Sequence, residues 1–308
     1  MKTVRQKIKE RFFNEYWPLW RLPLKFHSFW SDRSYLEFFY HKKMKRKIIL
    51  TQDHSDLQLF TEKIQWLKLY DRQPEYTDMV DKYNVFSYVA KTIGEEYLIP
   101  VYGVWDSIDK IPFKTLPDQF VLKCTHDSGG IYFCHDKKNI NMKKVNKYFN
   151  KRLARNFYWS SRQWVYKNIK PRIIAQEILF DDTNNTIKDY KIFCFGGEPK
   201  LIQVDLDRFS EKHRMNFYSP DWEFLPIKHF RPNDPSAAVE KPDCLNLLLE
   251  LAKKLSVGKI HVRVDFFVIK DKIYFGELTF YNYSGLVSFD PPEWDKTLGD
   301  WVILPKLF

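Results

Sequence analysis

The stretch IHVRVDFFVIKDKIYFGELTFYNYSG, residues 260–285, has the pattern of a β-hairpin. Apolar residues recur at alternate positions over residues 260–269 and 273–279, and the polar residues 270–272 separate the two runs. Alternation with a period of two is typical of strands that bury one face. The sequence therefore predicts two antiparallel strands joined by a tight turn.

Charged residues lie inside both predicted strands. We expect Ile269 to pair with Ile273 across the turn, and counting back from that pair places Asp265 directly opposite Glu277. Directly opposed side chains have Cβ atoms roughly 4.5–5.5 Å apart, and like charges at that separation repel. Two carboxylates in this position require a compensating charge.

Three explanations of the carboxylate pair stay open at this point. A divalent cation can lie between them, because Mg²⁺ is commonly held by one or two carboxylates together with phosphate oxygens. One carboxyl group can instead keep its proton. Alternatively Arg263, which the same count places on the same face opposite Thr279, neutralises the pair as part of a structural ion network.

A glycine turn forms a second notable motif. The predicted strand 119–124 brings Lys123 to the start of Thr125-His126-Asp127-Ser128-Gly129-Gly130, and another predicted strand, 131–135, follows at once. Backbone N–H groups of such a turn can bind phosphate while a lysine adds positive charge. The chain contains no G-x-x-x-x-G-K-[ST] loop, and a Ser-Gly-Gly turn also occurs in ordinary hairpins. His126 is expected to be a structural hydrogen-bonding residue.

Composition places the chain among ordered globular proteins with an anionic partner. The 308 residues are 44% hydrophobic and carry a formal charge of +11, which favours nucleotides, nucleic acids, lipid headgroups or acidic glycans. The four cysteines have no C-x-x-C spacing, which indicates neither a zinc site nor a disulfide framework. We therefore expect a cytoplasmic protein with no signal peptide and no transmembrane helix.

The first fifty residues are basic and rich in aromatic residues, with apolar positions at helical spacing. One interpretation is an amphipathic segment that contacts an anionic membrane at its inner face through residues 1–50. The other is a helix that packs on the domain with a solvated basic face.

The remaining pattern predicts an α+β fold. We expect helices at 56–70, behind a capping box at Ser55–Gln58, and along a stripe from Met79 to Ile93, with further helices near 141–157 and 243–256. Short strands are expected at 119–124, 131–135, 172–179, 189–195, 200–206 and in the opening hairpin. The order of these elements favours mixed or antiparallel sheets over a regular βαβ series.

A set of motifs in one order resembles the TupA-like (teichuronopeptide-biosynthesis) group of the ATP-grasp superfamily. The motifs are DKYNVFSYV (81–89), GEEYLIPVYGVWDS (94–107), LPDQFVLKCTHDSGG (116–130), YKNIKPRIIAQEIL (166–179), DYKIFCFGGEPKLIQVDLDRF (189–209), VRVDFFVIKDKIYFGELTFY (262–281) and EWDKTLGDW (293–301). The resemblance implies two α+β lobes that clasp ATP over residues 76–308, with a lid lobe in 76–178 and a metal and substrate lobe in 179–308. Residues 1–75 would form a helical segment ahead of them.

The resemblance also implies a chemistry, which is ADP-forming ligation. ATP phosphorylates a carboxylate, and an amine attacks the acyl phosphate to give an amide, with ATP and one or two Mg²⁺ ions as cofactors. The group's name implies carboxylate and amine substrates linked to a glycan or peptide, in polysaccharide or peptidopolymer biosynthesis of the cell envelope.

Roles in that chemistry transfer to matching positions of this chain. The resemblance assigns ATP binding to Lys123, Ser128, Gly129, Gly130, Gln176, Glu177, Ile178 and Asp182. It assigns catalysis to Arg263 and Lys191, metal binding to Asp265, Glu277 and Thr279, and substrate binding to Arg208, His213 and Arg214. Thr279 departs from the pattern, since many members have a metal-binding asparagine there and a threonine hydroxyl is a weaker ligand.

Two other functions compete with the ligase. Asp205-Leu206-Asp207 is a D-x-D sequence, which in a metal-dependent glycosyltransferase could hold a cation on a nucleotide-sugar. A nucleic-acid-binding module would account for the charge and the aromatic residues, but no nucleic-acid motif is recognisable in the sequence. We rank both below the ligase, because neither gives a role to Lys123, the glycine turn or the Asp265–Glu277 pair.

Overall fold

The computed structural model describes residues 30–180, 187–206, 211, 213–237, 239–270 and 272–306. The chain divides into two compact units. We call Gln73–Asp182 the continuous unit, and Met1–Arg72 together with Thr183–Phe308 the discontinuous unit. The expected division gave residues 1–75 a segment of their own, whereas the part of that segment up to residue 72 groups with the chain beyond residue 182.

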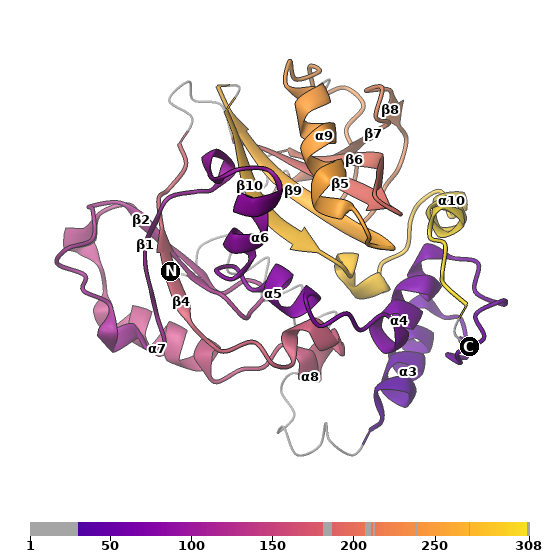
Figure 1. Cartoon of the computed structure of the whole chain (residues 1–308), viewed down its shortest axis with the longest axis horizontal. Helices are drawn as coiled ribbons and strands as arrows, with labels where there is room; N and C mark the ends of the chain where they lie inside the picture. The colour runs from indigo at the N-terminus through magenta and orange to yellow at the C-terminus, as the bar shows by residue number, and fades with distance from the viewer. Residues whose placement is uncertain are drawn as a thin grey trace. The chain divides into compact units, whose positions relative to one another are not determined.

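The continuous unit is built on an antiparallel sheet with strand order β1-β4-β2-β3 (Figure 1). Its elements are α5 (Tyr76–Val80), α6 (Val85–Thr92), η2 (Glu95–Tyr97), β1 (Val101–Trp105), η3 (Ile108–Lys110), β2 (Phe120–Cys124), β3 (Ile131–Cys134), η4 (Lys137–Asn139), α7 (Met142–Leu153), α8 (Tyr158–Ser161), η5 (Trp164–Tyr166) and β4 (Ile173–Gln176). Val145 and Phe149 of α7 pack into one apolar cluster with Leu122 and Ala175 of the sheet. This packing holds the strand that carries Lys123.

The discontinuous unit contains a larger antiparallel sheet with strand order β10-β9-β5-β6-β7-β8. Its elements are α3 (Asp32–Met44), α4 (Phe60–Tyr70), β5 (Lys188–Phe195), β6 (Glu198–Leu206), β7 (Arg214–Tyr218), β8 (Phe224–Leu225), α9 (Leu245–Ser256), β9 (His261–Ile269), β10 (Lys272–Thr279), η6 (Asn282–Gly285) and α10 (Glu293–Trp301). All strand pairs in both sheets are antiparallel, and the predicted α+β class is confirmed. The sequence pattern missed β1, β7 and the two-residue strand β8.

The two faces of the larger sheet differ in chemistry. Helix α9 crosses one face of this sheet (Figure 1). On this face the thiol of Cys194 lies 3.8 Å from the carbonyl oxygen of Ala252. Because side chains alternate along a strand, Asp189, Lys191 and Phe193 of β5 project from the opposite face. We call this opposite face, together with the residues of β9 and β10 that share it, the polar face.

One end of the polar face is covered by α4 and α10. The ring of Phe60 packs edge-on against His261, and Asp295 of α10 accepts hydrogen bonds from the backbone N–H and the hydroxyl of Thr61. Burial lowers the pKa of His261 to about 3, so this imidazole is neutral in the apolar end of the face. Helix α4 is therefore part of the same core as the hairpin.

The β9–β10 hairpin has the predicted carboxylate pair but a different register at the turn. Lys272, not Ile273, pairs with Ile269, so the prediction at the turn was wrong by one residue. A bulge between Phe275 and Glu277 then shifts the register by one residue.

Gly276 forms this bulge, and beyond it Asp265 lies opposite Glu277 and Arg263 opposite Thr279, as predicted. A Cβ atom at Gly276 would lie 2.9 Å from the carbonyl oxygen of Asp265. Only glycine permits this close approach of the two strands.

Two helices differ from their predicted form. The stripe from Met79 to Ile93 is two helices, α5 and α6, because the Asp81 carboxylate accepts hydrogen bonds from the backbone N–H groups of Tyr83 and Asn84 and so interrupts the helix. Helix α4 begins at Phe60 rather than residue 56.

The capping residue of α4 also differs from the prediction. Glu62, rather than the predicted Ser55–Gln58 box, caps the start of the helix by accepting from the N–H groups of Gln58 and Leu59.

Most of the basic N-terminal segment, residues 1–29, lies outside the described residues. The part that follows packs on the domain, since Tyr35, Leu36, Phe39 and Tyr40 of α3 are buried. Within the described ranges, no helix combines the length and the apolar character that a bilayer crossing requires.

The bulge gives a testable consequence. Gly276→Ala should lower the free energy of unfolding by about 1–3 kcal/mol, because the added methyl group forces the two strands apart. Urea unfolding measures this loss, and Gly258→Ala is the matched control. Gly258 has φ +76° but no atom within 4 Å of its Cβ position, so its replacement adds backbone strain alone. Such strain costs about 1 kcal/mol. A smaller loss for Gly276→Ala than for the control would contradict the close approach.

Candidate functional site

The opposed carboxylates of the β9–β10 hairpin share one guanidinium. Nε and Nη2 of Arg263 lie 2.7 Å from the two carboxylate oxygens of Asp265, and Nη2 lies 3.4 Å from Oε1 of Glu277. A planar guanidinium binds a carboxylate in this bidentate way. The arginine network is thus present, and it accounts for the two like charges at opposed positions.

Burial divides the roles of these three side chains. Arg263 and Asp265 are buried, whereas the Glu277 side chain is 44% exposed. Burial by itself would lower the pKa of Arg263, but Asp265 and then Glu277 outweigh it and raise that pKa. Burial raises the pKa of Asp265 above its ordinary value, and the charges of Arg263 and Lys191 oppose that rise.

The oxygen atoms around Arg263 fit a magnesium ion shared with phosphate. Thr279 accepts a hydrogen bond from Arg263 Nη2 at 3.1 Å and donates one to Glu277 Oε1 at 3.3 Å. Three side chains with hard oxygen atoms, those of Asp265, Glu277 and Thr279, therefore converge around Arg263. Mg²⁺ takes one or two protein carboxylates and completes its shell with water and phosphate. Among the described residues, no group of three or more His, Cys, Asp and Glu side chains is placed to hold a metal. The site therefore fits an ion held jointly with a phosphorylated ligand, and not one enclosed by protein alone.

Lys191 joins this cluster from the neighbouring strand β5. It pairs with Asp265 in the sheet register, and its Nζ lies 3.8 Å from Asp265 Oδ2. Nζ also contacts the carboxylate of Asp189 and lies 3.2 Å from Asp205 Oδ2. The two residues assigned to catalysis, Arg263 and Lys191, therefore lie on the polar face on either side of Asp265.

Asp205 lies on the far side of Lys191 and does not resemble an exposed cation ligand. It is buried, and Gln203 Nε2 donates to its Oδ1 at 2.8 Å. His213 and Arg214 also belong to this region, since Nε2 of His213 lies 3.7 Å from Asp205 Oδ1 and Arg214 begins β7. Asp207, the other half of the D-x-D sequence, lies outside the described residues, and the ion pair with Lys191 occupies Asp205.

Asn282 is a site residue that the sequence pattern did not reveal. Its Oδ1 accepts a hydrogen bond from Arg263 Nη1 at 2.6 Å, and the side chain is buried. It follows β10 in η6, where Tyr283 and Ser284 adopt positive φ. The signal available in the sequence was the unusual Tyr281-Asn282-Tyr283-Ser284-Gly285 continuation.

Helix α4 holds the loop that carries Asn282. Lys68 Nζ donates to the carbonyl and the hydroxyl of Ser284, and Gln65 Nε2 donates to the carbonyls of Ser284 and Gly285. Lys68 is fully buried, and burial lowers its pKa well below the ordinary value. Its amino group is hydrogen-bonded inside the core by the Ser284 carbonyl. Residues ahead of the predicted ATP-grasp region thus position Arg263 through Asn282.

The glycine turn lies in the continuous unit between β2 and β3. Lys123 is half-buried on β2, paired with Ile131 and Ile174. Ser128 is exposed and Gly129 has φ +98°. A Cβ at Gly130 would lie 2.8 Å from that of Cys124, so the return of the chain requires glycine here.

Buried polar contacts support this turn from below. Arg152 of α7 donates to Asp127 Oδ2 at 2.7 Å, and Lys82 donates to the Asp127 carbonyl at 2.9 Å. His126 Nε2 lies 3.2 Å from the Arg152 carbonyl, and burial lowers the pKa of His126. His126 is therefore a buried, structural hydrogen-bonding residue, in agreement with the sequence-based expectation.

The hinge segment assigned to the adenine ring follows β4. Gln176 ends β4 between β1 and β2, and its side chain is buried. The N–H of Glu177 donates to the Pro100 carbonyl, the Glu177 side chain is exposed, and Ile178 is buried. Asp182 and Arg208, the predicted ribose and substrate contacts, lie outside the described residues.

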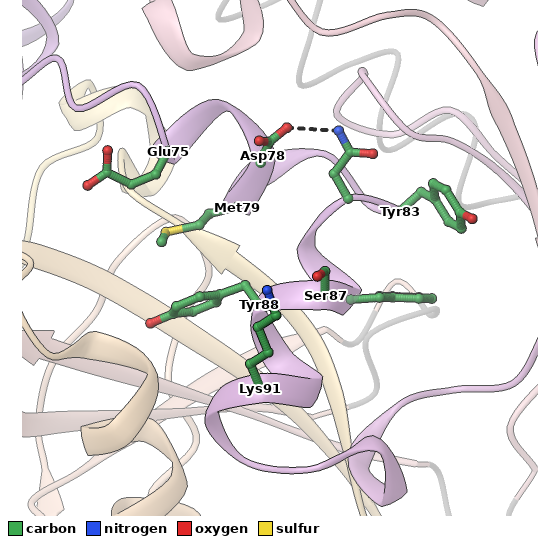
Figure 2. A pocket seen from close by; sticks show the side chains of 9 residues that line it. Glu75, Asp78, Met79, Tyr83, Ser87, Tyr88 and Lys91 are labelled. Atoms are coloured by element: carbon green, nitrogen blue, oxygen red, sulfur yellow. Dashed lines mark hydrogen bonds between the residues drawn. The ribbon is translucent and has the colours of Figure 1, made fainter.

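A hollow of about 580 Å³ opens on the helices of the continuous unit, away from these residues. It is lined by Glu75, Asp78, Met79, Tyr83, Asn84, Phe86, Ser87, Tyr88 and Lys91 (Figure 2). Asn84 Nδ2 donates a hydrogen bond of 2.8 Å to Asp78 Oδ1, drawn as the dashed line at Asp78 in Figure 2. None of the described residues that we assigned to a site lines this hollow.

Comparison with known proteins identifies one family. The model described as TupA-like ATPgrasp matches residues 62–303, which is most of the chain. No curated protein matches the sequence.

Three solved structures with similar folds share little sequence with this chain. An L-amino acid ligase from Bacillus licheniformis is 14% identical, with a TM-score of 0.45 and coverage of 88% of this chain and 58% of that one. A D-alanine–D-alanine ligase from Bacillus anthracis complexed with ATP is 12% identical, with a TM-score of 0.38 and coverage of 65% and 53%. An N5-carboxyaminoimidazole synthetase from Staphylococcus aureus complexed with ADP is 13% identical, with a TM-score of 0.39 and coverage of 65% and 44%. The chain thus spans about half the length of these proteins.

Replacing Arg263 tests whether the carboxylate pair can hold a cation. Arg263→Gln should lower the free energy of unfolding by about 3 kcal/mol, because two opposed carboxylates lose their counter-charge. Added MgCl₂, without nucleotide, should raise the melting temperature of this variant more than that of the wild type, since Mg²⁺ replaces the missing charge. The double variant Arg263→Gln/Glu277→Gln is the control and should lose this response. A melting temperature of Arg263→Gln that is indifferent to Mg²⁺ would argue for a purely structural network.

Proposed function

Because the chain belongs to the TupA-like ATP-grasp family, we propose that it is an ATP-dependent, ADP-forming carbon–nitrogen ligase. The single observation that carries this proposal is the cluster of Arg263, Asp265, Glu277 and Lys191 on one face of one sheet. Structural ion pairs are common in cores, but this cluster has an exposed carboxylate at its edge. Such an edge suits a ligand that brings its own phosphate oxygens.

The residues of the discontinuous unit support a phosphoryl-transfer role. Bound Mg²⁺ would be held by Asp265 and Glu277, with Thr279 as a further oxygen donor, and would screen the negative charge of the triphosphate. Arg263 and Lys191 place two cations beside Asp265, where they would stabilise charge that develops on the phosphoryl oxygens and on the acyl oxygen. The amide is then formed when an amine attacks the acyl phosphate.

The residues of the continuous unit support nucleotide binding. Lys123 would contact a phosphate, and the backbone of Ser128-Gly129-Gly130 would lie over the phosphates. The Asp127–Arg152 pair fixes the base of that turn. The backbone of Gln176, Glu177 and Ile178 would contact the adenine ring, with Asp182 on the ribose.

The family description supports a finer proposal about the substrates. We propose that the carboxylate and amine belong to a glycan or peptide precursor of a cell-surface polymer, that Arg208 or Arg214 binds a substrate carboxylate, and that the enzyme acts in the cytoplasm. The basic segment over residues 1–50 would bring it to the inner face of an anionic membrane.

Thermal unfolding tests the nucleotide site before any substrate is known. Saturating Mg·ATP should raise the melting temperature of the wild type, since a ligand at about 100 times its Kd stabilises the folded state by about 2.7 kcal/mol. Glu277→Gln should reduce this shift and lower ADP release by about 100-fold. Glu250→Gln is the matched control, because Glu250 lies in an exposed pair with Lys254 on α9. A wild-type shift with a UDP-sugar and none with ATP would support a glycosyltransferase instead.

A further inference from the structure

An uninterrupted row of charged side chains crosses the polar face and ends at a histidine. The row starts at the carboxylate of Glu277, whose Oε1 lies 3.4 Å from Arg263 Nη2. The same nitrogen lies 2.7 Å from Asp265 Oδ2. It continues from Asp265 to Lys191 at 3.8 Å. The charges alternate in sign from strand β10 to strand β5.

Beyond Lys191 the row continues onto strand β6 and the start of β7. Asp205 Oδ2 lies 3.2 Å from Lys191 Nζ, and His213 Nε2 lies 3.7 Å from Asp205 Oδ1. His213 directly precedes β7 and is 11% exposed at its side chain. The imidazole of His213 thus lies beside the buried carboxylate of Asp205, which in turn contacts Lys191.

The carboxylate behind His213 is held in its charged form. Burial by itself would raise the pKa of Asp205, but Lys191 and then His213 outweigh it and lower that pKa. Gln203 fixes the orientation of the carboxylate through its hydrogen bond to Oδ1. A charged, oriented carboxylate holds a neighbouring imidazole in one tautomer and orientation.

Histidine is the side chain suited to proton transfer near neutral pH. In amide formation from an acyl phosphate, the attacking amine must shed a proton, and none of the other members of the row can take one. Arg263 and Lys191 carry positive charge, Asp265 and Asp205 pair with them, and the proposed metal site takes the carboxylate of Glu277. This leaves His213 as the proton acceptor of the row.

We propose that His213, backed by Asp205, is the general base that accepts the proton of the attacking amine. This inference rests on the proposed ligase function. The amine nitrogen forms the new C–N bond, the bond between the acyl carbon and the phosphate oxygen breaks, and the phosphate leaves with that electron pair. Before the attack, the bound ammonium form of the amine gives one proton to Nδ1 of His213, because Nε2 faces Asp205. The second proton, lost from the nitrogen as the amide forms, leaves with the phosphate.

Charged groups from neighbouring strands lie near His213. The charged groups that face it are Asp205 from β6, with Lys191 behind it, and Arg214, whose guanidinium donates to the His213 carbonyl at 3.2 Å. Removal of this base should slow amide formation most near neutral pH, where a free amine is largely protonated. In a variant without the base, the rate should recover as the pH rises, because the free amine then loses its proton to solvent.

The experiment separates activation of the carboxylate from attack by the amine. Wild type and His213→Gln are each incubated with Mg·ATP, hydroxylamine as the nucleophile, and one carboxylate at a time. The carboxylates are the twenty amino acids, glucuronate and galacturonate. Hydroxylamine is largely uncharged at neutral pH and needs no base, so hydroxamate should form equally with both proteins. With glycine or glucosamine as the amine, His213→Gln should be slower by about 100-fold at about pH 7. The deficit should shrink at about pH 9.5, where more of the amine is neutral.

Controls keep the outcomes distinct. His41→Gln is the matched control, since His41 is an exposed histidine on α3, and His213→Asn is a second variant in case His213→Gln has an altered melting temperature. Wild-type rates with both nucleophiles in folded His213 variants would overturn the role of His213 alone. An equal loss of hydroxamate and amide would make His213 a residue for activation or structure, not a base. No hydroxamate from any carboxylate with the wild type would overturn the ligase function itself and this inference with it.

Discussion

The guanidinium of Arg263 between two opposed carboxylates is the interaction on which the rest of the site depends. Asp265 and Glu277 lie directly opposite each other across two strands, where like charges repel. Bidentate pairing with Asp265 and contact with Glu277 offset that repulsion. Because the cluster is buried at Asp265 and exposed at Glu277, it can serve as a core network and still receive a ligand at its edge.

The scaffold around this cluster explains how its geometry is kept. Gly276 allows the bulge that sets the pairing, and Asn282 binds the remaining nitrogen of the guanidinium. The loop with Asn282 is held in turn by Gln65 and Lys68 of α4. A helix far from the hairpin in sequence thus positions its charged residues, which agrees with a family match that begins at residue 62.

Much of the fold followed from the sequence because periodicity reports burial directly. Strands β2, β3, β4, β5, β6, β9 and β10 were predicted as short β-rich runs. The charged residues of the hairpin, Arg263, Asp265 and Glu277, lie on one face as counted. The carboxylate pairing was right even though the turn register was wrong, since the bulge at Gly276 compensates for the shift at Lys272. An isolated glycine in a strand is a signal of such a bulge, and it was overlooked.

Other features could not be read from the sequence. The break between α5 and α6 depends on competition by the Asp81 carboxylate, which a helical stripe does not reveal. The contact of Lys68 with Ser284 joins residues 216 positions apart. Asn282 lies in a loop whose residues Tyr283 and Ser284 have rare backbone angles. The family resemblance assigned roles to single motifs. The row of charged residues that ends at His213 could not be predicted from them, because it depends on the order of the strands in the sheet.

The central claim is that the Arg263 cluster is a site for a cation and nucleotide and not only a structural network. The most direct measurement is a crystal structure of the protein with Mg²⁺ and a non-hydrolysable ATP analogue. We expect a cation about 2.1 Å from a carboxylate oxygen of Glu277, with a phosphate oxygen in its shell. A nucleotide bound elsewhere, with Arg263 still spanning both carboxylates and no cation beside them, would contradict it.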